Sequence, residues 1–241
     1  MRGVILAGGK GVRLRPLTEI TNKHLLPVGR EPMIWHSVKQ FCLAGIKDIL
    51  VITSTEHMGD IVNSLGSGTR FGCKFTYRVQ EEAKGIAHAL SLAEDFASNG
   101  KIAVLLGDNI FEYSIIEHCN AFTKQRSGAR ILLKEVNDPG RFGIAALDEK
   151  QIVQIEEKPL KPSSNYAVVG CYMYDQQVFE IVRGLTPGKN GEFGITTVNK
   201  VYLERGQLEY GYVQGAWMDS GTFESLQEAN SILLKNSNNI L

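Results

Sequence analysis

Short apolar runs alternate with amphipathic segments over the first half of the chain. Aliphatic and β-branched residues predict buried strands at 3–7, 48–54, 74–79 and 101–108. Apolar residues at helical spacing predict helices at 32–44, 56–65 and 85–96, and Ser114 with Glu117 forms a capping box before a further helix. Strands that alternate with helices form a parallel sheet covered on both faces, so an open α/β sheet is expected here.

The pattern changes after about residue 128. Strand-like segments follow one another with little helix between them, at 129–136, 142–148, 151–159 and 166–174. They predict strands of mixed direction that extend the same sheet. Helices return at 176–184, 195–205 and 223–235, the last with Thr222 as N-cap, and the polar tail 236–241 is expected to fray. The predicted fold is a single α/β domain over 1–241, with a Rossmann-like open mixed sheet that is mostly parallel and has helices on both faces.

Composition limits the partners of the chain. The 26 Lys and Arg residues balance 26 Asp and Glu residues, so no overall charge attracts nucleic acid or an anionic membrane. The four cysteines form no CxxC pair and predict reduced thiols rather than a zinc site or a disulfide framework. No apolar run is long enough for a signal peptide or a membrane span. We expect a cytoplasmic protein that binds neither nucleic acid nor membrane.

A glycine-rich loop follows the first predicted strand. In VILAGGKGVRLRP, residues 4–16, the strand runs into Gly8, Gly9 and Gly11 and then into Arg13. Glycines let backbone N–H groups approach an anion closely, and a tight turn would explain one glycine but not three. The loop therefore favours a phosphate site. It is not a GxGxxG loop, because Leu14 stands at the third glycine position, and it lacks the GK[ST] ending of a P-loop.

Longer stretches of the sequence resemble one known family. LAGGKGVRLRPLT is similar to the LAGGxGTRLxPLT signature of the sugar-1-phosphate nucleotidyltransferases, and NKHLLPVG, LGDNIF, FGI, EEKP, YAVVGCYMYD and WMDSGT follow in the family's order. Together these blocks most resemble the short-type glucose-1-phosphate thymidylyltransferases. The resemblance implies the nucleotide-diphospho-sugar transferase fold, with a nucleotide-binding half at about 1–127 and a sugar-binding half at about 128–235.

The resemblance also implies a reaction. A nucleoside monophosphate is transferred from dTTP to a sugar 1-phosphate, with glucose 1-phosphate as the expected sugar, and pyrophosphate and a dTDP-sugar for polysaccharide biosynthesis are formed. Two alternatives keep this chemistry, with UTP as the nucleotide or with a deoxy or amino hexose 1-phosphate as the sugar. A non-catalytic sugar-nucleotide-binding protein is a further alternative, but it would not need the charged residues that the resemblance assigns to catalysis. A nicotinamide oxidoreductase is disfavoured by the failed GxGxxG test.

Carried over residue by residue, the resemblance implies a nucleotide site and a metal. Catalysis is expected to depend on Arg13, which neutralises the triphosphate, on Lys23, which bridges phosphates near the reacting centre, and on Asp108. Asp108 and Asp219 are the implied ligands of Mg²⁺, which prefers oxygen ligands. Each acid could instead cap a following helix, although Thr222 is better placed to cap the last one. The nucleotide is implied to contact Leu6, Ala7, Gly8, Gly9, Gly11, Arg13, Gln80, Gly85 and Asp108.

A second set of residues is implied to bind the sugar phosphate. Glu157 and Lys158 could otherwise form a surface ion pair, which contributes little to stability, and Trp217 could otherwise belong to the core. The amide of Gln80 offers a donor and an acceptor, which suits thymine and uracil equally. The implied sugar-phosphate residues are Asn109, Gly143, Glu157, Lys158, Val169, Tyr172, Gly194, Thr196 and Trp217.

One stretch departs from the family pattern. GEFGITTVN, residues 191–199, aligns with GELEITDxN, so Gly194 replaces a glutamate that normally binds sugar hydroxyls and Thr197 replaces an aspartate; Val169 replaces a common threonine. Either water fills the space beside Gly194 and glucose 1-phosphate stays the best substrate, or the preference shifts to deoxy or amino hexose 1-phosphates. Longer relatives continue into a regulatory nucleotide site, so feedback inhibition and the oligomeric state, including a homo-oligomer, stay open.

Overall fold

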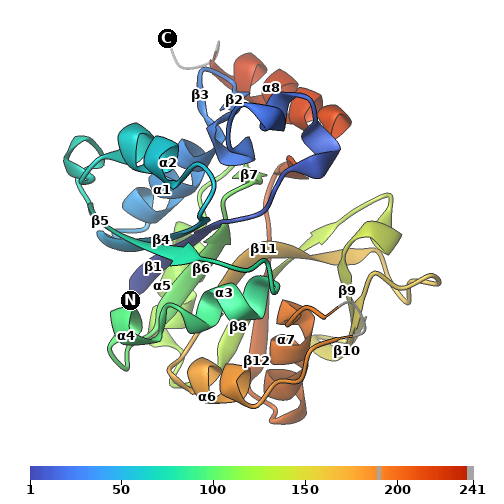
Figure 1. The fold of residues 1–241 in the computed structure, drawn as a ribbon. Helices are drawn as coiled ribbons and strands as arrows, with labels where there is room; N and C mark the ends of the chain where they lie inside the picture. The colour runs from blue at the N-terminus through green and yellow to red at the C-terminus, as the bar shows by residue number, and fades with distance from the viewer. Residues whose placement is uncertain (189–190, 238–241) are drawn as a thin grey trace. The chain divides into compact units, whose positions relative to one another are not determined.

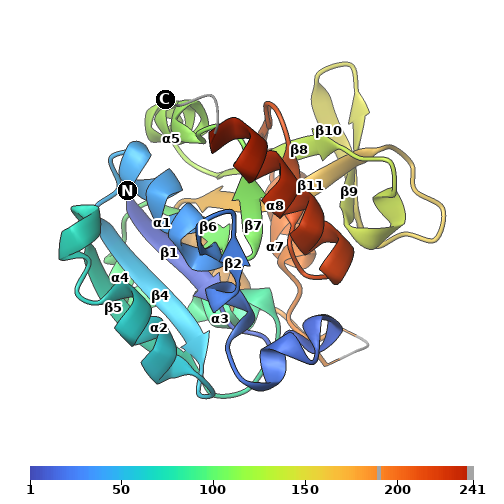
Figure 2. The same cartoon turned by 90° about the horizontal axis from the view of Figure 1, so that it is seen from above.

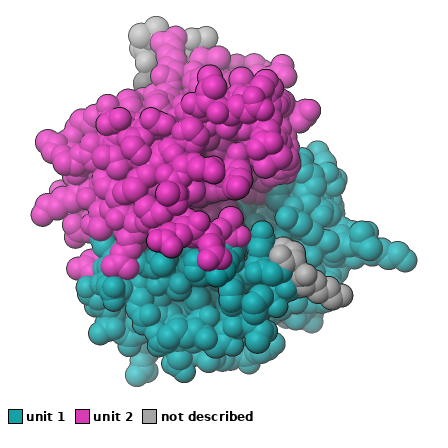
Figure 3. Space-filling view, viewed as in Figure 1, with its two compact units in different colours: residues 1, 84–104, 118–213 teal, residues 2–83, 105–117, 214–241 magenta. Residues whose placement is uncertain are grey.

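The structure is a computed structural model that describes residues 1–188 and 191–237. Within it the chain forms two compact units, each assembled from separate stretches of the sequence (Figure 3). Unit 1 comprises residue 1 and the described residues within 84–104 and 118–213. Unit 2 comprises those within 2–83, 105–117 and 214–241. Each unit therefore combines residues that lie far apart in the sequence.

The centre of unit 2 is a parallel sheet of β1 (Arg2–Ala7), β4 (Asp48–Ser54) and β5 (Lys74–Gln80). Ile5 lies opposite Val51, which in turn lies opposite Tyr77. β1 and β4 are nearly continuous apolar runs with buried side chains, as expected of strands that are covered on both faces. Figure 2 shows α1 (Met33–Leu43) and α2 (Met58–Leu65) beside these strands. Past the end of α1, Gly45 has left-handed backbone (φ 73), which glycine adopts readily at the end of a helix.

Short elements connect the sheet of unit 2 to the end of the chain. Three 3₁₀ helices follow β1, namely η1 (Val12–Leu14), η2 (Leu17–Glu19) and η3 (Lys23–Leu25), and η4 (Thr69–Phe71) precedes β5. β2 (Pro27–Val28) pairs with β3 (Glu31–Pro32), and β7 (Asn109–Phe111) pairs antiparallel with β13 (Trp217–Asp219). The last helix, α8 (Phe223–Ser237), follows β13.

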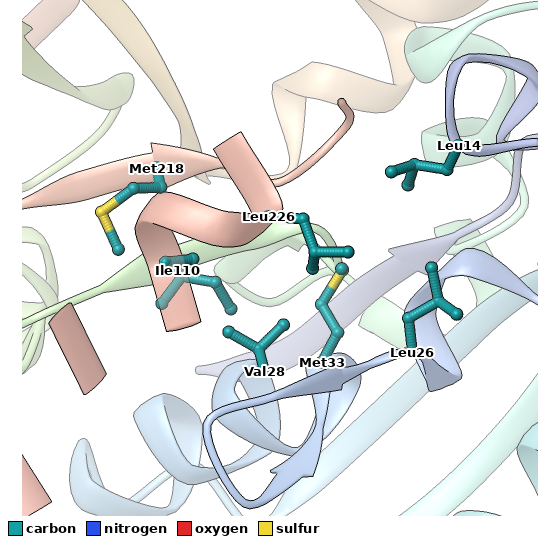
Figure 4. Packing of buried hydrophobic residues seen from close by; sticks show 8 residues of the cluster. Leu14, Leu26, Val28, Met33, Ile110, Met218 and Leu226 are labelled. Atoms are coloured by element: carbon teal, nitrogen blue, oxygen red, sulfur yellow. The ribbon is translucent and has the colours of Figure 1, made fainter. Parts of the chain in front are cut away.

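Helix α8 packs against elements from the beginning of the chain. Figure 4 shows its Leu226 within a buried cluster that includes Val28, Met33 and Ile110. The Gly29 N–H donates to Asn230 Oδ1 at 2.8 Å and adds a polar contact to this packing. The cluster therefore holds β2, α1 and β7 against α8. Its remaining buried members are Leu14, Leu26, Met218 and Ala229.

Unit 1 is built mainly on antiparallel strands (Figure 1). β9 (Gly143–Asp148) and β10 (Gln151–Glu157) form a hairpin, and β11 (Tyr166–Tyr174) pairs with β9 and with β8 (Ala129–Glu135). β12 (Leu208–Tyr212) pairs in parallel with β8. The other elements are α3 (Ile86–Ser91), α4 (Glu94–Ala97), η5 (Pro139–Arg141), α6 (Gln177–Arg183) and α7 (Ile195–Glu204). The chain passes from unit 1 to unit 2 within β6 (Ile102–Leu106) and returns to unit 1 within α5 (Ile116–Lys124).

The predicted α/β class with an open mixed sheet is confirmed, but three expectations were wrong in detail. The helix expected over 85–96 is broken, because Leu92 and Ala93 make tighter bonds to the carbonyl groups three residues back. The strand expected over 101–108 ends at Leu106, and β7 follows Asp108 as a separate strand. β12 and β13 were not expected, because both are short and β13 forms by pairing with a distant segment. Residues 236 and 237 of the expected frayed tail lie within α8, and 238–241 lie outside the described residues.

Two expectations about the whole chain concern its thiols and the membrane. All four cysteines are free thiols, and three of them, Cys73, Cys119 and Cys171, are buried, as the sequence predicted. Among the helices of the described part, none combines the length and the apolar character that crossing a bilayer requires.

Candidate active site

The glycine loop of unit 2 packs closely on the 3₁₀ helices that follow it. Gly9 and Gly11 have left-handed backbone, with φ values of 105 and 59. A Cβ atom on Gly11 would lie 2.8 Å from Thr18 Cγ2 and 3.1 Å from Lys23 Cβ. Thr18 Oγ1 also donates to the Gly11 carbonyl oxygen at 2.8 Å. Both the backbone conformation and the close approach therefore require glycine at position 11.

Lys23 extends from η3 along the glycine loop to Asp108. A Cβ atom on Gly9 would lie 3.9 Å from Lys23 Cε, and Lys23 Nζ forms an ion pair with Asp108 Oδ2. Asp108 Oδ1 accepts from Asn109 Nδ2 at 3.1 Å. Burial by itself would raise the pKa of Asp108, but the charge of Lys23, with the hydrogen bonds from Lys23 and Asn109, keeps it well below its usual range. Asp108 is therefore a buried and ionised carboxylate.

His24 is buried beside this ion pair in its neutral form. The residue is 1% exposed, and its backbone N and its Nδ1 lie 2.9 Å and 2.7 Å from Asn22 Oδ1. A Cβ atom on Gly107 would lie 2.8 Å from His24 Cδ2. Burial, and then the neighbouring Lys23 charge, lower the pKa of His24 to about 3 against the opposing effect of Asp108. His24 thus holds η3 between Asn22 and the residues just before Asp108.

Asp219 lies on the strand that pairs with the segment after Asp108. β13 ends at Asp219, and the following Ser220 N–H donates to the Asp108 carbonyl oxygen at 2.9 Å. A Cβ atom on Gly221 would lie 2.8 Å from Arg13 Nη2 and 3.2 Å from Asp219 Oδ1. Glycine at position 221 therefore allows Arg13 and Asp219 to approach each other, and unit 2 brings both predicted acids to neighbouring backbone.

The alternative roles of the two acids find little support. β7, and not a helix, follows Asp108, so Asp108 caps no helix. Thr222 Oγ1 accepts from the Ser225 N–H at 3.3 Å at the start of α8, as the sequence predicted.

The residues predicted to read the base belong to different units. Gln80 ends β5 in unit 2, and its Oε1 atom would lie 3.3 Å from a Cβ atom on Gly8, so its amide lies against the glycine loop. Leu6 and Ala7 are the last residues of β1 in the same unit. Gly85 belongs to unit 1, where it precedes α3 with φ 94 and ψ 174, a conformation that only glycine adopts readily.

Unit 1 gathers four of the predicted sugar-phosphate residues. Glu157 ends β10 opposite Gly143 of β9. Thr196 Oγ1, in the first turn of α7, donates to Glu157 Oε2, and a Cβ atom on Gly143 would lie 3.3 Å from Thr196 Oγ1. Lys158 Nζ lies 3.9 Å from Glu157 Oε1. Lys158 also has left-handed backbone (φ 43), which is uncommon and costs energy in a residue other than glycine.

Gly194 precedes α7, and few atoms of the described residues lie beside it. Its φ of −78 and ψ of 137 are ordinary for any residue. Within the described residues, the only atom within 4 Å of an added Cβ is Thr197 Oγ1, at 3.9 Å. Nothing in the backbone or the described packing therefore requires glycine at this position.

The other predicted sugar residues are held by core packing or by a hydrogen bond. Val169 on β11 is fully buried, and the ring of Tyr172 on the same strand stacks on Tyr174 at 6.2 Å. In unit 2, Trp217 Nε1 donates to Asn109 Oδ1 at 2.7 Å. Trp217 is therefore fixed by the residue that follows Asp108.

Comparison with known proteins identifies the family. The pattern of the family described as nucleotidyl transferase matches residues 2–236. This chain belongs to the nucleotidyl transferase family. A Neisseria meningitidis protein named glucose-1-phosphate thymidylyltransferase is 42% identical over 237 residues, which are 97% of this chain and 82% of that protein.

Solved structures agree with this nucleotidyl transferase fold. A Bacillus anthracis protein described as a glucose-1-phosphate thymidylyltransferase in complex with sucrose has a TM-score of 0.94 and 52% identity, and covers 97% of this chain and 95% of its own. A UDP-glucose pyrophosphorylase complexed with UDP-glucose has a TM-score of 0.86 and 25% identity, with 98% of each chain covered.

The donor set of this nucleotidyl transferase fits a hard cation. In the part of the chain that the structure describes, no three His, Cys, Asp or Glu side chains form a group that could hold a metal by themselves. Asp108 and Asp219 instead provide two carboxylates on neighbouring backbone. Mg²⁺ is commonly held by one or two carboxylates, with phosphate oxygens and water as its other ligands.

Sequence reasoning missed two residues that shape the candidate site. Thr18 holds the glycine loop, and His24 holds η3 beside Asp108. Their only signal in the sequence was their position inside the blocks RLRPLT and NKHLLP. Nothing in the sequence distinguishes His24 from an ordinary surface or core histidine, whereas the structure buries it beside the Lys23–Asp108 ion pair.

Proposed function

We propose that this nucleotidyl transferase transfers the thymidylyl group of dTTP to glucose 1-phosphate and forms dTDP-glucose and pyrophosphate. The observation that carries the proposal is the Lys23–Asp108 ion pair, which places a fixed cation and a buried carboxylate beside the glycine loop. The substrates are supported by relatives named glucose-1-phosphate thymidylyltransferase, which are 42%, 40% and 38% identical over nearly the whole chain.

The triphosphate is assigned to unit 2. Backbone N–H groups of the glycine loop and the Lys23 ammonium bind phosphate oxygens, and Arg13 neutralises the pyrophosphate as it leaves. Gln80, which lies against Gly8, reads the base. UTP is the alternative nucleotide, because an amide pairs equally with thymine and uracil.

A divalent cation, which we assign as Mg²⁺, would be held by Asp108 and Asp219. When bound, it supplies Lewis-acid stabilisation of the charge on the phosphate oxygens. Asp108 suits this role because its contact with Lys23 keeps it ionised at neutral pH although it is buried. Asp219 lies on β13 opposite Asn109, and the carbonyl oxygen of Asp108 accepts from the Ser220 N–H.

The sugar phosphate is assigned to the Glu157 cluster of unit 1. Lys158 binds its phosphate, and Glu157, oriented by Thr196, accepts a hydrogen bond from a sugar hydroxyl. An oxygen of the sugar phosphate forms a bond to the α-phosphorus of dTTP while the bond to pyrophosphate breaks. This oxygen is already negatively charged and needs no general base, so positioning and electrostatic stabilisation carry the catalysis.

The chain's halves are assigned in the same way. We propose one nucleotidyltransferase domain over 1–241, in which residues up to about 127 supply most nucleotide contacts and residues 128–235 supply most sugar contacts. Asn109 and Trp217, which the family resemblance assigns to the sugar phosphate, belong to unit 2. Their hydrogen bond ties the residue after Asp108 to β13, where a sugar ring can pack on the indole face.

Pyrophosphate release tests the proposed function. The purified protein with Mg²⁺, dTTP and glucose 1-phosphate is expected to release pyrophosphate, and omission of any one of the three is expected to abolish it. Lys23→Met is expected to lower the rate by about two orders of magnitude or more, because it removes a cation from the phosphates. Lys39→Met is the matched control, because Lys39 lies on the surface of unit 2 and pairs with Glu31.

The same assay separates the alternatives. Release with UTP in place of dTTP would identify a uridylyltransferase. Binding of both substrates without release of pyrophosphate would contradict catalysis and favour a sugar-nucleotide-binding protein. A poor rate with glucose 1-phosphate would favour a modified hexose, which the open space beside Gly194 supports.

A further inference from the structure

Phe193 connects two loops of unit 1 through its main chain. Its N–H donates to the Lys84 carbonyl oxygen at 2.8 Å, and its own carbonyl oxygen accepts from the Ala87 N–H at 3.0 Å. Its ring lies beside the His88 ring, with 6.4 Å between the centroids. Residues 84–87, which we call the base turn, are therefore fastened to residues 191–196, which we call the sugar loop.

The base turn is shaped to fit this connection. Gly85 lies directly under Phe193, because a Cβ atom on Gly85 would lie 2.6 Å from the Phe193 carbonyl oxygen and 3.0 Å from its N atom. The backbone of Gly85 (φ 94, ψ 174) is also open only to glycine. Glycine at position 85 therefore allows the Phe193 main chain to approach and make its two hydrogen bonds. It also allows the backbone conformation of the base turn.

The sugar loop continues the connection to the charged residues of unit 1. Gly194 is the N-cap of α7, directly after Phe193. Thr196, in the first turn of α7, donates to Glu157, and Lys158 lies next to Glu157 with its N–H bonded to the Phe142 carbonyl oxygen. A shift of Phe193 would move the start of α7 and, through Thr196, the Glu157 carboxylate.

We propose that Phe193 is a positioning residue that couples the base turn to the sugar loop, so that a base bound at Gly85 and a sugar phosphate bound at Glu157 and Lys158 strengthen each other's binding. The inference rests on the proposed function for the identity of the two ligands. Its physical basis is that each ligand orders a loop that is bonded to the other, so the second ligand finds a loop already in place.

Binding measurements without turnover test the coupling. Thymidine carries the base but no phosphate, so it probes the base turn without electrostatic repulsion from glucose 1-phosphate. Titration calorimetry of the wild-type protein is expected to show thymidine binding about fivefold or more tightly with saturating glucose 1-phosphate than without it. Glucose 1-phosphate must gain the same factor from saturating thymidine, because coupling of binding free energies is reciprocal.

Three variants separate a loss of coupling from a general loss of ligand binding. Gly85→Ala pushes on the Phe193 carbonyl oxygen and is expected to reduce the coupling to less than about twofold, even where each ligand still binds alone. Gly59→Ala is the matched control, because no described atom lies within 4 Å of an added Cβ there and its φ is ordinary; its coupling is expected to equal that of the wild type. Phe193→Leu keeps both main-chain hydrogen bonds and is expected to retain most of the coupling.

Hydrogen exchange of the wild-type protein gives a second reading that needs no variant. Thymidine alone is expected to slow exchange of the Phe193 amide, and glucose 1-phosphate alone is expected to slow exchange of the Ala87 amide.

Coupling below about twofold in the wild type, or full coupling in a folded Gly85→Ala variant, would overturn the inference. If both ligands bind with coupling and yet the complete mixture releases no pyrophosphate, the proposed function fails while the inference stands. If neither ligand binds, both fail.

Discussion

At the scale of single residues, Asp108 keeps its charge inside the protein because Lys23 is in contact with it. A buried ion pair is expensive to desolvate and often gives no net stability. Its presence beside the glycine loop is therefore better explained by function than by folding. Asn109 and His24 hold the two partners in place, and neither carries a charge that would weaken the pair.

Asp108→Asn and Asp219→Asn test the metal ligands. Each change keeps the shape of the side chain and removes the negative charge, so turnover is expected to fall by about two orders of magnitude or more. The measurement is kcat at saturating Mg²⁺, dTTP and glucose 1-phosphate, with the circular dichroism spectrum as a check of folding. Turnover near the wild-type value in a folded variant would remove that residue from the mechanism.

The pKa of His24 predicts a loss of stability in mild acid. In the unfolded chain His24 binds a proton near its ordinary pKa of 6.5, whereas burial, with the Lys23 charge, lowers the pKa to about 3 in the folded chain. Between these values the unfolded state binds more protons, so stability falls as the pH drops from about 6.5 towards 3. Asp108 acts in the same direction, but only near and below its ordinary pKa of 3.8.

His24→Gln removes the titrating group and tests this pH dependence. Between pH 7 and pH 4.5 the free energy of unfolding of the wild type is expected to fall by about 2–3 kcal/mol more than that of the variant. Urea denaturation at several pH values, with divalent cations chelated, measures both. Parallel pH profiles would show that His24 takes up protons equally in the folded and unfolded chains.

At the scale of elements, the periodicity of the sequence was sufficient where an element is long and locally determined. β1, β4, α1 and α7 appear within about two residues of their predicted bounds, because each is a continuous apolar run or a regular apolar stripe. β13 is three residues long and exists because Trp217 pairs with Phe111, more than a hundred residues earlier. No local pattern specifies such a pairing, although it is the one that places Asp219.

A substitution at Gly194, the N-cap of α7, tests sugar specificity. Gly194→Glu restores the carboxylate that the family usually has, and the φ of Gly194 and the described atoms around an added Cβ permit a side chain there. A panel of hexose 1-phosphates is assayed by kcat/KM with both proteins. If specificity has shifted, the wild type is expected to be poor with glucose 1-phosphate, and the variant is expected to gain about tenfold through one new hydrogen bond. If the wild type already prefers glucose 1-phosphate, and as strongly as the variant does, the hypothesis of an altered sugar preference is wrong.

The end of helix α5 depends on one lysine. Lys101 Nζ donates to the carbonyl oxygens of Phe122 at 3.0 Å and Thr123 at 3.1 Å, and also to that of Gln125. A cation that bonds the free carbonyl groups at a helix end stabilises it. Lys101→Met is expected to lower the free energy of unfolding by about 1–3 kcal/mol in urea denaturation. Lys200→Met, at an exposed position of α7, is the control and is expected to change it by less than about 0.5 kcal/mol; equal effects would contradict the account.

At the scale of the whole molecule, sequence patterns predicted the class of fold, whereas the make-up of the two compact units came from the structure alone. The expected halves divide near residue 127, whereas each compact unit includes stretches from both sides of that point. Such interleaving is set by long-range packing, such as that of Leu226 on Val28 and Met33, which periodicity does not encode. The same holds for the candidate site. The family-like sequence blocks located Lys23 and Asp108. The contact between these two residues, the neutral state of His24 and the main-chain bridge through Phe193 could be found only in the folded structure.

Following the α-phosphorus of dTTP tests the central claim most directly. The protein is incubated with Mg²⁺, glucose 1-phosphate and dTTP that carries radioactive phosphorus at the α-position, and the products are separated. The label is expected to move into a dTDP-sugar, because the sugar phosphate attacks this phosphorus and pyrophosphate leaves unlabelled. Label recovered as thymidine monophosphate would show attack by water, and label that stays in dTTP while both substrates bind would show that no transfer occurs; either result would contradict the account.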